Sequence, residues 1–178
     1  MENEVPEAYY FNKRIIVPEE EEANRIHERG ATGKPLSGGG LQLAPVEALY
    51  LLEREKIKII SKEEGETLSF DDFFSKFSDI DPELMFKYIV YQDLRSRGYV
   101  VKTGLKYGAH FRVYERGVTP GTDHSAYLVH AISENENLTP HDLSRAVRLA
   151  HSVRKKMIFA VIDNEGDVTY YSLTRETP

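Results

Sequence analysis

The chain has 178 residues with 40% hydrophobic side chains, among them 11 Tyr and 8 Phe, which is enough to build a core and excludes a disordered polypeptide. It has no cysteine, so disulfides, thiolate zinc sites and cysteine nucleophiles are excluded, and a cytoplasmic location is expected. The formal net charge of −6 argues at first against a nucleic-acid partner, and no apolar run reaches the roughly 18–20 residues that span a bilayer, so no membrane partner is expected.

Residues 1–80 are predicted to form a small N-terminal α/β domain. Its first 35 residues are polar and broken, and we interpret the four glutamates at 19–22 as a solvated, turn-like segment. Three consecutive glycines at 38–40 predict a flexible turn before a short strand at 41–43.

Two helices and one strand are predicted in the rest of this domain. Pro45 suits the first position of a helix whose expected apolar face is formed by Val46, Leu49, Tyr50 and Leu52. Residues 57–60 read as a strand. Ser69 is the expected N-cap of an amphipathic helix that buries four phenylalanines, Phe70, Phe73, Phe74 and Phe77.

Residues 81–178 are predicted to form a second domain with the element order α-β-β-β-α-β-β. Asp81 and Pro82 begin its first helix and Gly98 ends it. The remaining elements are expected at residues 99–101, 110–114, 126–129, 139–153, 157–162 and 168–173. The fold class is therefore α/β (α+β), with a mixed sheet packed with helices in each of two small domains.

The net charge hides an acid–base–acid layout along the chain. Residues 1–83 carry 10 basic and 19 acidic side chains, residues 84–157 carry 12 and 6, and residues 158–178 carry 1 and 4. A polyanionic partner is therefore compatible with the middle block in spite of the total.

The sequence lacks the common motifs of nucleotide and metal sites. It contains neither a Gly-x-x-x-x-Gly-Lys-Ser/Thr loop nor a His-Glu-x-x-His helix. No Asp or Glu is followed two residues later by Lys, which is the carboxylate–lysine signature of many metal-dependent nucleases. We therefore expect no metal and no cofactor, although scattered carboxylates could still build a metal site.

The basic block holds a metal-free set of candidates: Tyr114 at a strand end, His124 in a polar turn, and the basic run at residues 151–156. Metal-free cleavage of RNA needs a base for the 2′-hydroxyl, an acid for the departing 5′-oxygen and a fixed cation near phosphorus. A Tyr, a His and a Lys can supply all three, provided that cations such as Arg112, Arg116 and Lys155 assist the Tyr. Each of these residues taken alone is more often structural, and the helix dipole also favours a basic helix end.

Five segments resemble one known family. Residues 88–104 (YIVYQDLRSRGYVVKTG) and 106–117 (KYGAHFRVYERG) resemble the start of the catalytic domain of archaeal tRNA-splicing endonucleases. The similarity continues at 124–129 (HSAYLV) and 148–156 (RLAHSVRKK) and extends more loosely into the first domain at 43–52 (LAPVEALYLL). Several motifs in the right order are more specific than any one of them.

The resemblance implies an RNA endonuclease of the tRNA-intron lyase type. This family cuts precursor tRNA at intron–exon junctions within a bulge–helix–bulge RNA and leaves a 2′,3′-cyclic phosphate and a 5′-hydroxyl without a catalytic metal. Its Tyr–His–Lys triad corresponds to Tyr114 as base, His124 as acid and Lys155 as the stabilising cation. Its two base-clamping arginines, one from each of two subunits, correspond to Arg148 and, by distance from the C-terminus, to Arg175.

The resemblance also implies self-assembly, because a chain near this length with its own triad is similar to the homotetrameric type. In that type an acidic loop inserts into a basic groove of the opposing dimer. Asp163, Glu165 and Asp167 occupy the matching hairpin loop, which could otherwise be an ordinary polar turn. A heterotetramer with a catalytically silent partner chain remains an alternative.

The sequence is also compared with the requirements of two other functions. A non-catalytic structural subunit that binds RNA or a catalytic partner is the alternative, but such subunits typically lack the triad that this chain has. A DNA-cleaving metal nuclease is disfavoured by the missing carboxylate–lysine motif.

Overall fold

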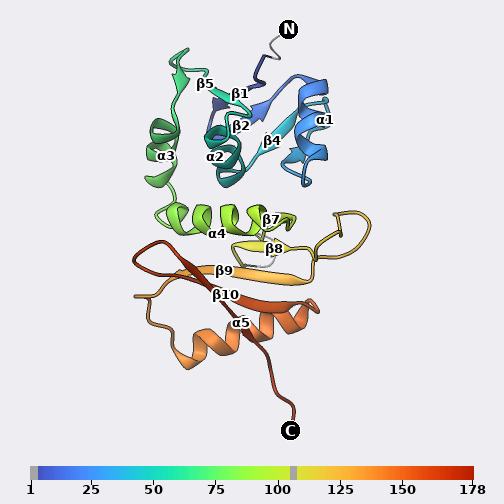
Figure 1. Ribbon diagram of the computed structural model, residues 1–178, viewed down its shortest axis with the longest axis vertical. Coiled ribbons are helices and arrows are strands. Elements are labelled where there is room, and N and C mark those ends of the chain that lie inside the picture. Colours follow the sequence, from blue (N-terminus) through green and yellow to red (C-terminus); the bar gives the residue numbers. More distant parts are fainter. Residues whose placement is uncertain (1–3, 105–107) are drawn as a thin grey trace. The chain divides into compact units, whose positions relative to one another are not determined.

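A computed structural model describes residues 4–104 and 108–178, and it divides the chain into two compact units, residues 1–88 and 89–178 (Figure 1). The division falls within a helix that the expected boundary at residue 81 would place wholly in the second domain. Lys106 and Tyr107, which belong to the second resembling segment, lie outside the described residues. None of the helices in the described ranges is long and apolar enough to cross a membrane.

The first unit is built on a six-stranded mixed sheet in the order β3-β4-β2-β1-β5-β6. β1 and β5 pair in parallel and the other neighbours pair antiparallel. Its elements are β1 (Glu7–Phe11), β2 (Arg14–Val17), α1 (Glu20–Glu28), β3 (Lys34–Pro35), β4 (Leu41–Leu43), α2 (Pro45–Glu53), β5 (Lys58–Ser61), β6 (Thr67–Leu68) and α3 (Phe70–Ser78).

The prediction of a broken N-terminal segment is wrong. Asn12 and Lys13 both take positive φ angles, 49° and 61°, and so form the tight two-residue turn that joins β1 to β2. Glu19, Glu20 and Glu21 are exposed, as expected, and Glu22 is half-buried, but residues 20–22 form the first turn of α1. Glu19 caps α1 by accepting hydrogen bonds from the backbone N–H groups of Glu21 and Glu22, and the helix dipole favours acidic side chains in this first turn.

The two predicted helices of this unit form, but their buried faces differ from the expectation. In α2, Ala48 and Leu51 are buried with Val46 and Leu49, whereas Tyr50 is half-buried beneath the Arg54 guanidinium. Leu52 is likewise only half-buried. In α3, Phe73 and Phe77 enter the core, and Phe70 and Phe74 stack on each other in a half-buried position.

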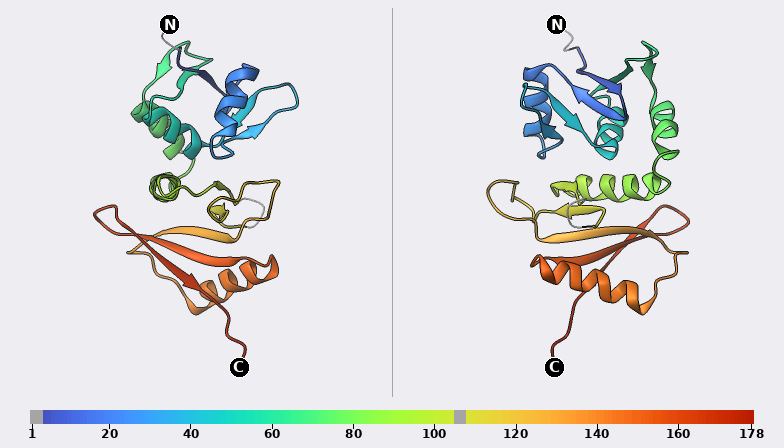
Figure 2. Two further views of the ribbon diagram at one scale, coloured as in Figure 1. Left: turned by 45° about the vertical axis from the view of Figure 1, so that its right-hand side comes forward. Right: turned by 180° about the vertical axis from the view of Figure 1, so that it is seen from behind.

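The second unit has the predicted order and a five-stranded mixed sheet in the order β11-β10-β9-β8-β7. α4 and α5 lie on opposite faces of this sheet (Figures 1 and 2). The elements are α4 (Leu84–Ser96), β7 (Val101–Thr103), β8 (Phe111–Val113), β9 (Tyr127–Ser133), α5 (Pro140–Ser152), β10 (Lys156–Ile162) and β11 (Val168–Leu173).

The position of β10 explains its apolar sequence. It pairs in parallel with β9 over seven residues and antiparallel with β11, so both of its edges are occupied. Met157, Phe159 and Ala160 are buried, and the first two join a hydrophobic cluster with Ala150 of α5. α5 thus packs against one face of β10, in agreement with the buried strand that the near-continuous apolar run predicted.

On the opposite face of the sheet, residues of α4 contact β8 and β11. The Tyr91 ring packs against Phe111 at 6.0 Å between centroids. The Tyr170 hydroxyl donates a hydrogen bond to Asp93 Oδ2 at 2.6 Å, and the same carboxylate accepts one from Arg97 Nε at 3.0 Å. Burial raises the pKa of Tyr170, so its hydroxyl stays a donor at all ordinary pH values.

Candidate active site

Three neighbouring strands end at the same edge of the second sheet. The Ala126 N–H donates to the Val113 carbonyl at 3.0 Å, and the Lys156 N–H donates to the Ala126 carbonyl at 3.0 Å. These two bonds join the exit of β8, the entry of β9 and the entry of β10 side by side. Residues immediately beyond these strand ends therefore lie together, although they are far apart in the sequence.

Tyr114 is the first residue after β8, and its side chain is only 6% exposed. Its backbone N–H donates to the Val100 carbonyl at 3.1 Å, which extends the pairing of β8 with the β7 side. The guanidinium of Arg116 lies 4.8 Å from the Tyr99 ring centroid, so a cation is held close to this strand end.

His124 lies in the loop between β8 and β9, and it is exposed. Its backbone N–H donates to the Asp123 carboxylate at 2.7 Å. The preceding turn is closed by the Thr122 hydroxyl, which donates to the Thr119 carbonyl at 2.8 Å. The loop thus has internal bonds that orient it while the imidazole faces solvent, where it can exchange a proton with a substrate.

Lys155 lies between α5 and β10 and is half-buried. Its Nζ donates to the Ser125 carbonyl at 2.7 Å, and Ser125 itself is buried. This bond fixes the position of one of the three ammonium donors of Lys155. The bond also ties the Lys155 side chain to the residue next to His124.

The structure therefore brings the three sequence-predicted residues to one end of three adjacent strands. A buried phenol, an exposed imidazole and an anchored ammonium can together accept a proton, donate a proton and stabilise negative charge. Among the residues that the structure describes, no three His, Asp or Glu side chains form a group suited to a metal ion.

The two predicted arginines line one pocket of about 850 Å³. Arg148 lies on the exposed side of α5, and Arg175 follows β11. The resemblance implies that the two arginines of one clamp come from different subunits, whereas here both line the same pocket of one chain. The other lining residues are His141, Leu143, Ser144, Val147, Ser172, Leu173 and Thr174.

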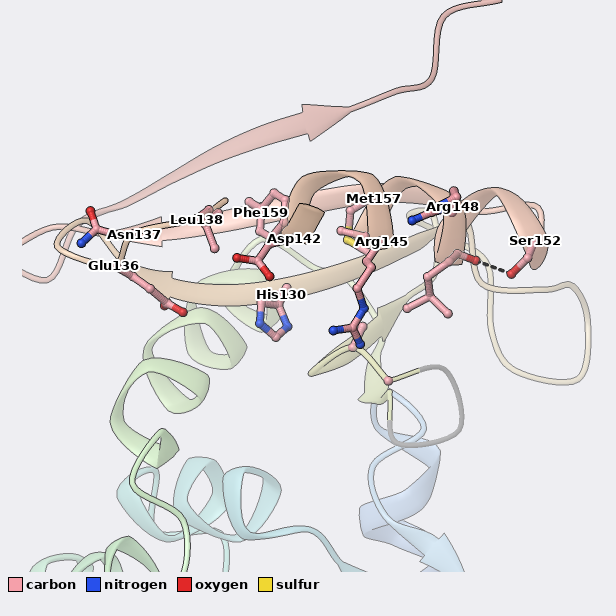
Figure 3. A pocket seen from close by; sticks show the side chains of 14 residues that line it. His130, Glu136, Asn137, Leu138, Asp142, Arg145, Arg148, Ser152, Met157 and Phe159 are labelled. Atoms are coloured by element: carbon pink, nitrogen blue, oxygen red, sulfur yellow. Dashed lines mark hydrogen bonds between the residues drawn. The ribbon is translucent and has the colours of Figure 1, made fainter. Parts of the chain in front are cut away.

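A second hollow of about 690 Å³ lies along α5 on the same sheet (Figure 3). Arg145 of α5 and His130 of β9 lie around it, and Arg148 lines both hollows. His130 stacks on His110 at 4.0 Å between ring centroids, and His110 Nδ1 accepts a hydrogen bond from the Ala131 N–H at 3.0 Å. The sequence alone did not pair these histidines, because their proximity depends on the register of β8 with β9.

The predicted acidic loop joins β10 to β11. Asp163 has a structural part in it, since its Oδ1 accepts hydrogen bonds from the backbone N–H groups of Glu165 and Asp167, both at 2.9 Å. Glu165 and Asp167 are exposed. Asp163 therefore shapes the turn, and the other two carboxylates are presented to solvent.

Comparison with known proteins gives consistent matches over both units. Residues 84–170 match the family described as tRNA intron endonuclease, catalytic C-terminal domain, and residues 7–74 match its N-terminal domain. A tRNA-splicing endonuclease of Methanothermobacter thermautotrophicus is 48% identical over 149 residues, which cover 84% of this chain and 85% of that one. Those of Pyrococcus horikoshii (39% identical, 94% of each chain) and Pyrococcus furiosus (41% identical, 95% of each chain) are also similar.

Proposed function

The chain belongs to the tRNA intron endonuclease family, and we propose that it cuts precursor tRNA at intron–exon junctions by attack of the 2′-hydroxyl on the adjacent phosphorus. The activity as a tRNA-splicing endonuclease follows from the family and from relatives that match nearly the whole chain. The RNA shape, the products and the residue roles below are the proposal.

The proposed reaction assigns one task to each residue of the triad. Tyr114, as phenolate, accepts the proton of the 2′-hydroxyl, and the freed oxygen bonds to phosphorus. The bond from phosphorus to the 5′-oxygen breaks, and His124 protonates that oxygen. The products are a 2′,3′-cyclic phosphate and a 5′-hydroxyl. The Lys155 ammonium offsets the extra negative charge on the phosphoryl oxygens in the transition state.

The observation that carries the proposal is the pair of backbone hydrogen bonds from Lys156 to Ala126 and from Ala126 to Val113. They place the residues that flank these strand ends side by side. The hydrogen bond from Lys155 Nζ to the Ser125 carbonyl adds a fixed cation beside the loop that carries His124. These contacts support the proposal, because acid–base cleavage with a fixed cation requires its groups to lie close together.

The proposed substrate is a bulge–helix–bulge RNA, and the proposed assembly is a homotetramer. Arg148 and Arg175, both exposed cations, are the candidates for contacts with an unstacked base, since guanidinium planes stack on bases. Glu165 and Asp167 are the carboxylates that could dock on a basic groove of another copy.

Cleavage of a bulge–helix–bulge RNA in the presence of EDTA tests the reaction. We expect two cuts, with cyclic-phosphate and 5′-hydroxyl ends on the fragments. Loss of activity in EDTA with recovery on addition of Mg²⁺ would refute the metal-free reaction. Tight binding without any cleavage would favour the alternative, a non-catalytic RNA-binding subunit.

A further inference from the structure

Within the described residues, α2, α4 and α5 are each followed by the same hydrogen-bonded motif. In each, the N–H of the third residue past the helix end bonds to a carbonyl five residues back, and the residue before it takes a positive φ. The bonds run from Lys56 to Leu51 at 2.8 Å, from Tyr99 to Leu94 at 3.2 Å and from Lys155 to Ala150 at 2.9 Å. The residues of positive φ are Glu55 (56°), Gly98 (89°) and Arg154 (57°).

Glycine suits this position best, because a side chain in the left-handed region brings Cβ against the backbone. The motif after α4 has Gly98 at this position, whereas the motif after α5 has Arg154, so the turn after α5 carries backbone strain that glycine would remove. Glu55 shows that a charged residue can occupy the motif, so the positive φ alone assigns no role to Arg154. The position of Arg154 next to Lys155 is the second observation that points to a role.

Arg154 immediately precedes Lys155, whose Nζ is anchored at the edge of the sheet that also carries Tyr114 and His124. The Arg154 side chain is exposed. Within residues 4–104 and 108–178 this guanidinium makes no hydrogen bond or ion pair, and residues 151–156 (HSVRKK) around it contain no carboxylate. A strained, solvent-facing cation is thus held beside the anchored one.

We propose that the Arg154 guanidinium binds an RNA phosphate adjacent to the one that Lys155 stabilises. This inference rests on the proposed function, because it presumes an RNA whose cleaved phosphate meets Lys155. The hydrogen-bonded motif after α5, which is of the Schellman type, holds both residues in place. It orients Lys155 toward Ser125 and leaves Arg154 exposed to solvent. A glycine would preserve the turn but would lose the phosphate contact.

The experiment compares Arg154→Gly with Lys13→Gly. Lys13 is also an exposed cation of positive φ, at 61°, but it lies in the β1–β2 turn of the first unit. Both substitutions remove one positive charge and relieve one left-handed side chain. Binding is measured over a range of salt with a bulge–helix–bulge RNA that carries 2′-deoxyriboses at the cleavage sites, so that it cannot be cut.

We expect both variants to melt at or above the temperature of the wild type, and only Arg154→Gly to bind the RNA more weakly. One lost phosphate contact lowers the slope of log K against log salt by about 0.9, so the deficit should shrink about threefold between about 50 and about 200 mM salt. Arg154→Lys should recover most of the affinity.

Equal affinity of Arg154→Gly and wild type across the salt range would overturn the inference, as would an equal loss in Lys13→Gly. Cleavage of the all-ribose RNA by the wild type is scored separately. Binding without cleavage would refute the proposed reaction and leave the Arg154 result to stand on the binding data.

Discussion

At the scale of single residues, two neighbouring lysines have different surroundings. Lys155 Nζ donates to the Ser125 carbonyl, whereas Lys156 is exposed and contributes its backbone to β10. The sequence motif contains both lysines, and the resemblance pointed to the first of them. The hydrogen bond gives a physical reason for the same choice, since a cation can be preorganised only if its position is fixed.

We therefore predict that Lys155→Ala lowers the cleavage rate by about 10²–10³-fold, the size of loss found when one stabilising donor of a transition state is removed. Lys156→Ala is the matched control and should cleave within a small factor of wild type. Single-turnover cleavage with saturating protein measures both. Equal losses in the two variants would contradict the assignment of Lys155.

A second residue-scale prediction concerns His124. Because its side chain is exposed, His124→Ala should leave the melting temperature unchanged. It should abolish cleavage without weakening RNA binding, since the imidazole is needed to protonate the departing oxygen rather than to hold the RNA. Cleavage at the wild-type rate would remove His124 from the proposed reaction.

At the scale of elements, α5 connects most of the site. Thr139 caps its start by accepting a hydrogen bond from the Asp142 N–H at 3.1 Å, and Asp142 Oδ2 accepts one from the Thr139 N–H at 2.9 Å. Arg148 lies in the last two turns, and the helix ends in the motif that delivers Lys155. A substitution that destabilises either end of α5 should therefore also displace residues of the site.

The cap gives a pH-dependent prediction. The Thr139 backbone N–H, and then its hydroxyl, hold the pKa of Asp142 below the ordinary value of 3.8. A folded-state pKa below the unfolded one means that the stabilisation is complete above pH 3.8 and is lost as pH falls through the folded value. Asp142→Asn should thus melt below wild type at pH 7, and the gap should close in acid.

Melting temperatures of both proteins from pH 7 down to about pH 2 check this prediction. Asp71→Asn serves as the control, because Asp71 lies in the first turn of α3 without a hydrogen bond recorded for its side chain among the described residues. A gap for Asp142→Asn that is constant with pH would show that its carboxylate charge does not stabilise α5.

At the scale of the whole molecule, the charge layout suits self-assembly as well as RNA binding. The basic block contains the strand ends and α5, and the acidic C-terminal block contains the loop with Glu165 and Asp167. If that loop docks on a basic groove of another copy, salt should weaken the assembly, since added salt shortens the Debye length from about 8–10 Å near physiological ionic strength and so screens exposed charges.

We predict that Glu165→Gln with Asp167→Asn shifts the protein from tetramer to a smaller species. These two carboxylates are chosen because Asp163 holds the turn, so its loss would confound folding with docking. Glu63→Gln with Glu66→Gln removes the same charge from an exposed turn of the first unit and should leave the size unchanged. Light scattering at low and high salt measures the assembly; a monomeric wild type would contradict the homotetramer.

Elements of the fold that depend on contacts between residues close in sequence could be predicted, and elements that depend on contacts between distant residues could not. The helices and strands of the second unit were predictable because caps, glycine stops and apolar runs are local signals. β1 and β2 were missed although aromatic and β-branched residues predominate in them, because both are short and polar residues flank them. β1 is stabilised by parallel pairing with β5 some fifty residues away. The half-burial of Phe70 and Phe74 likewise depends on packing that periodicity cannot supply.

The sequence by itself determined the element order of the second unit, the residue types of the proposed reaction and, through several ordered motifs, the family. Only the tertiary structure decided that Tyr114, Ser125 and Lys155 lie at one end of adjacent strands, and that Arg154 strains the turn beside them. The physical reason is strand register. Hydrogen bonds such as those from Ala126 to Val113 and from Lys156 to Ala126 set it between distant parts of the chain, and no local pattern encodes them.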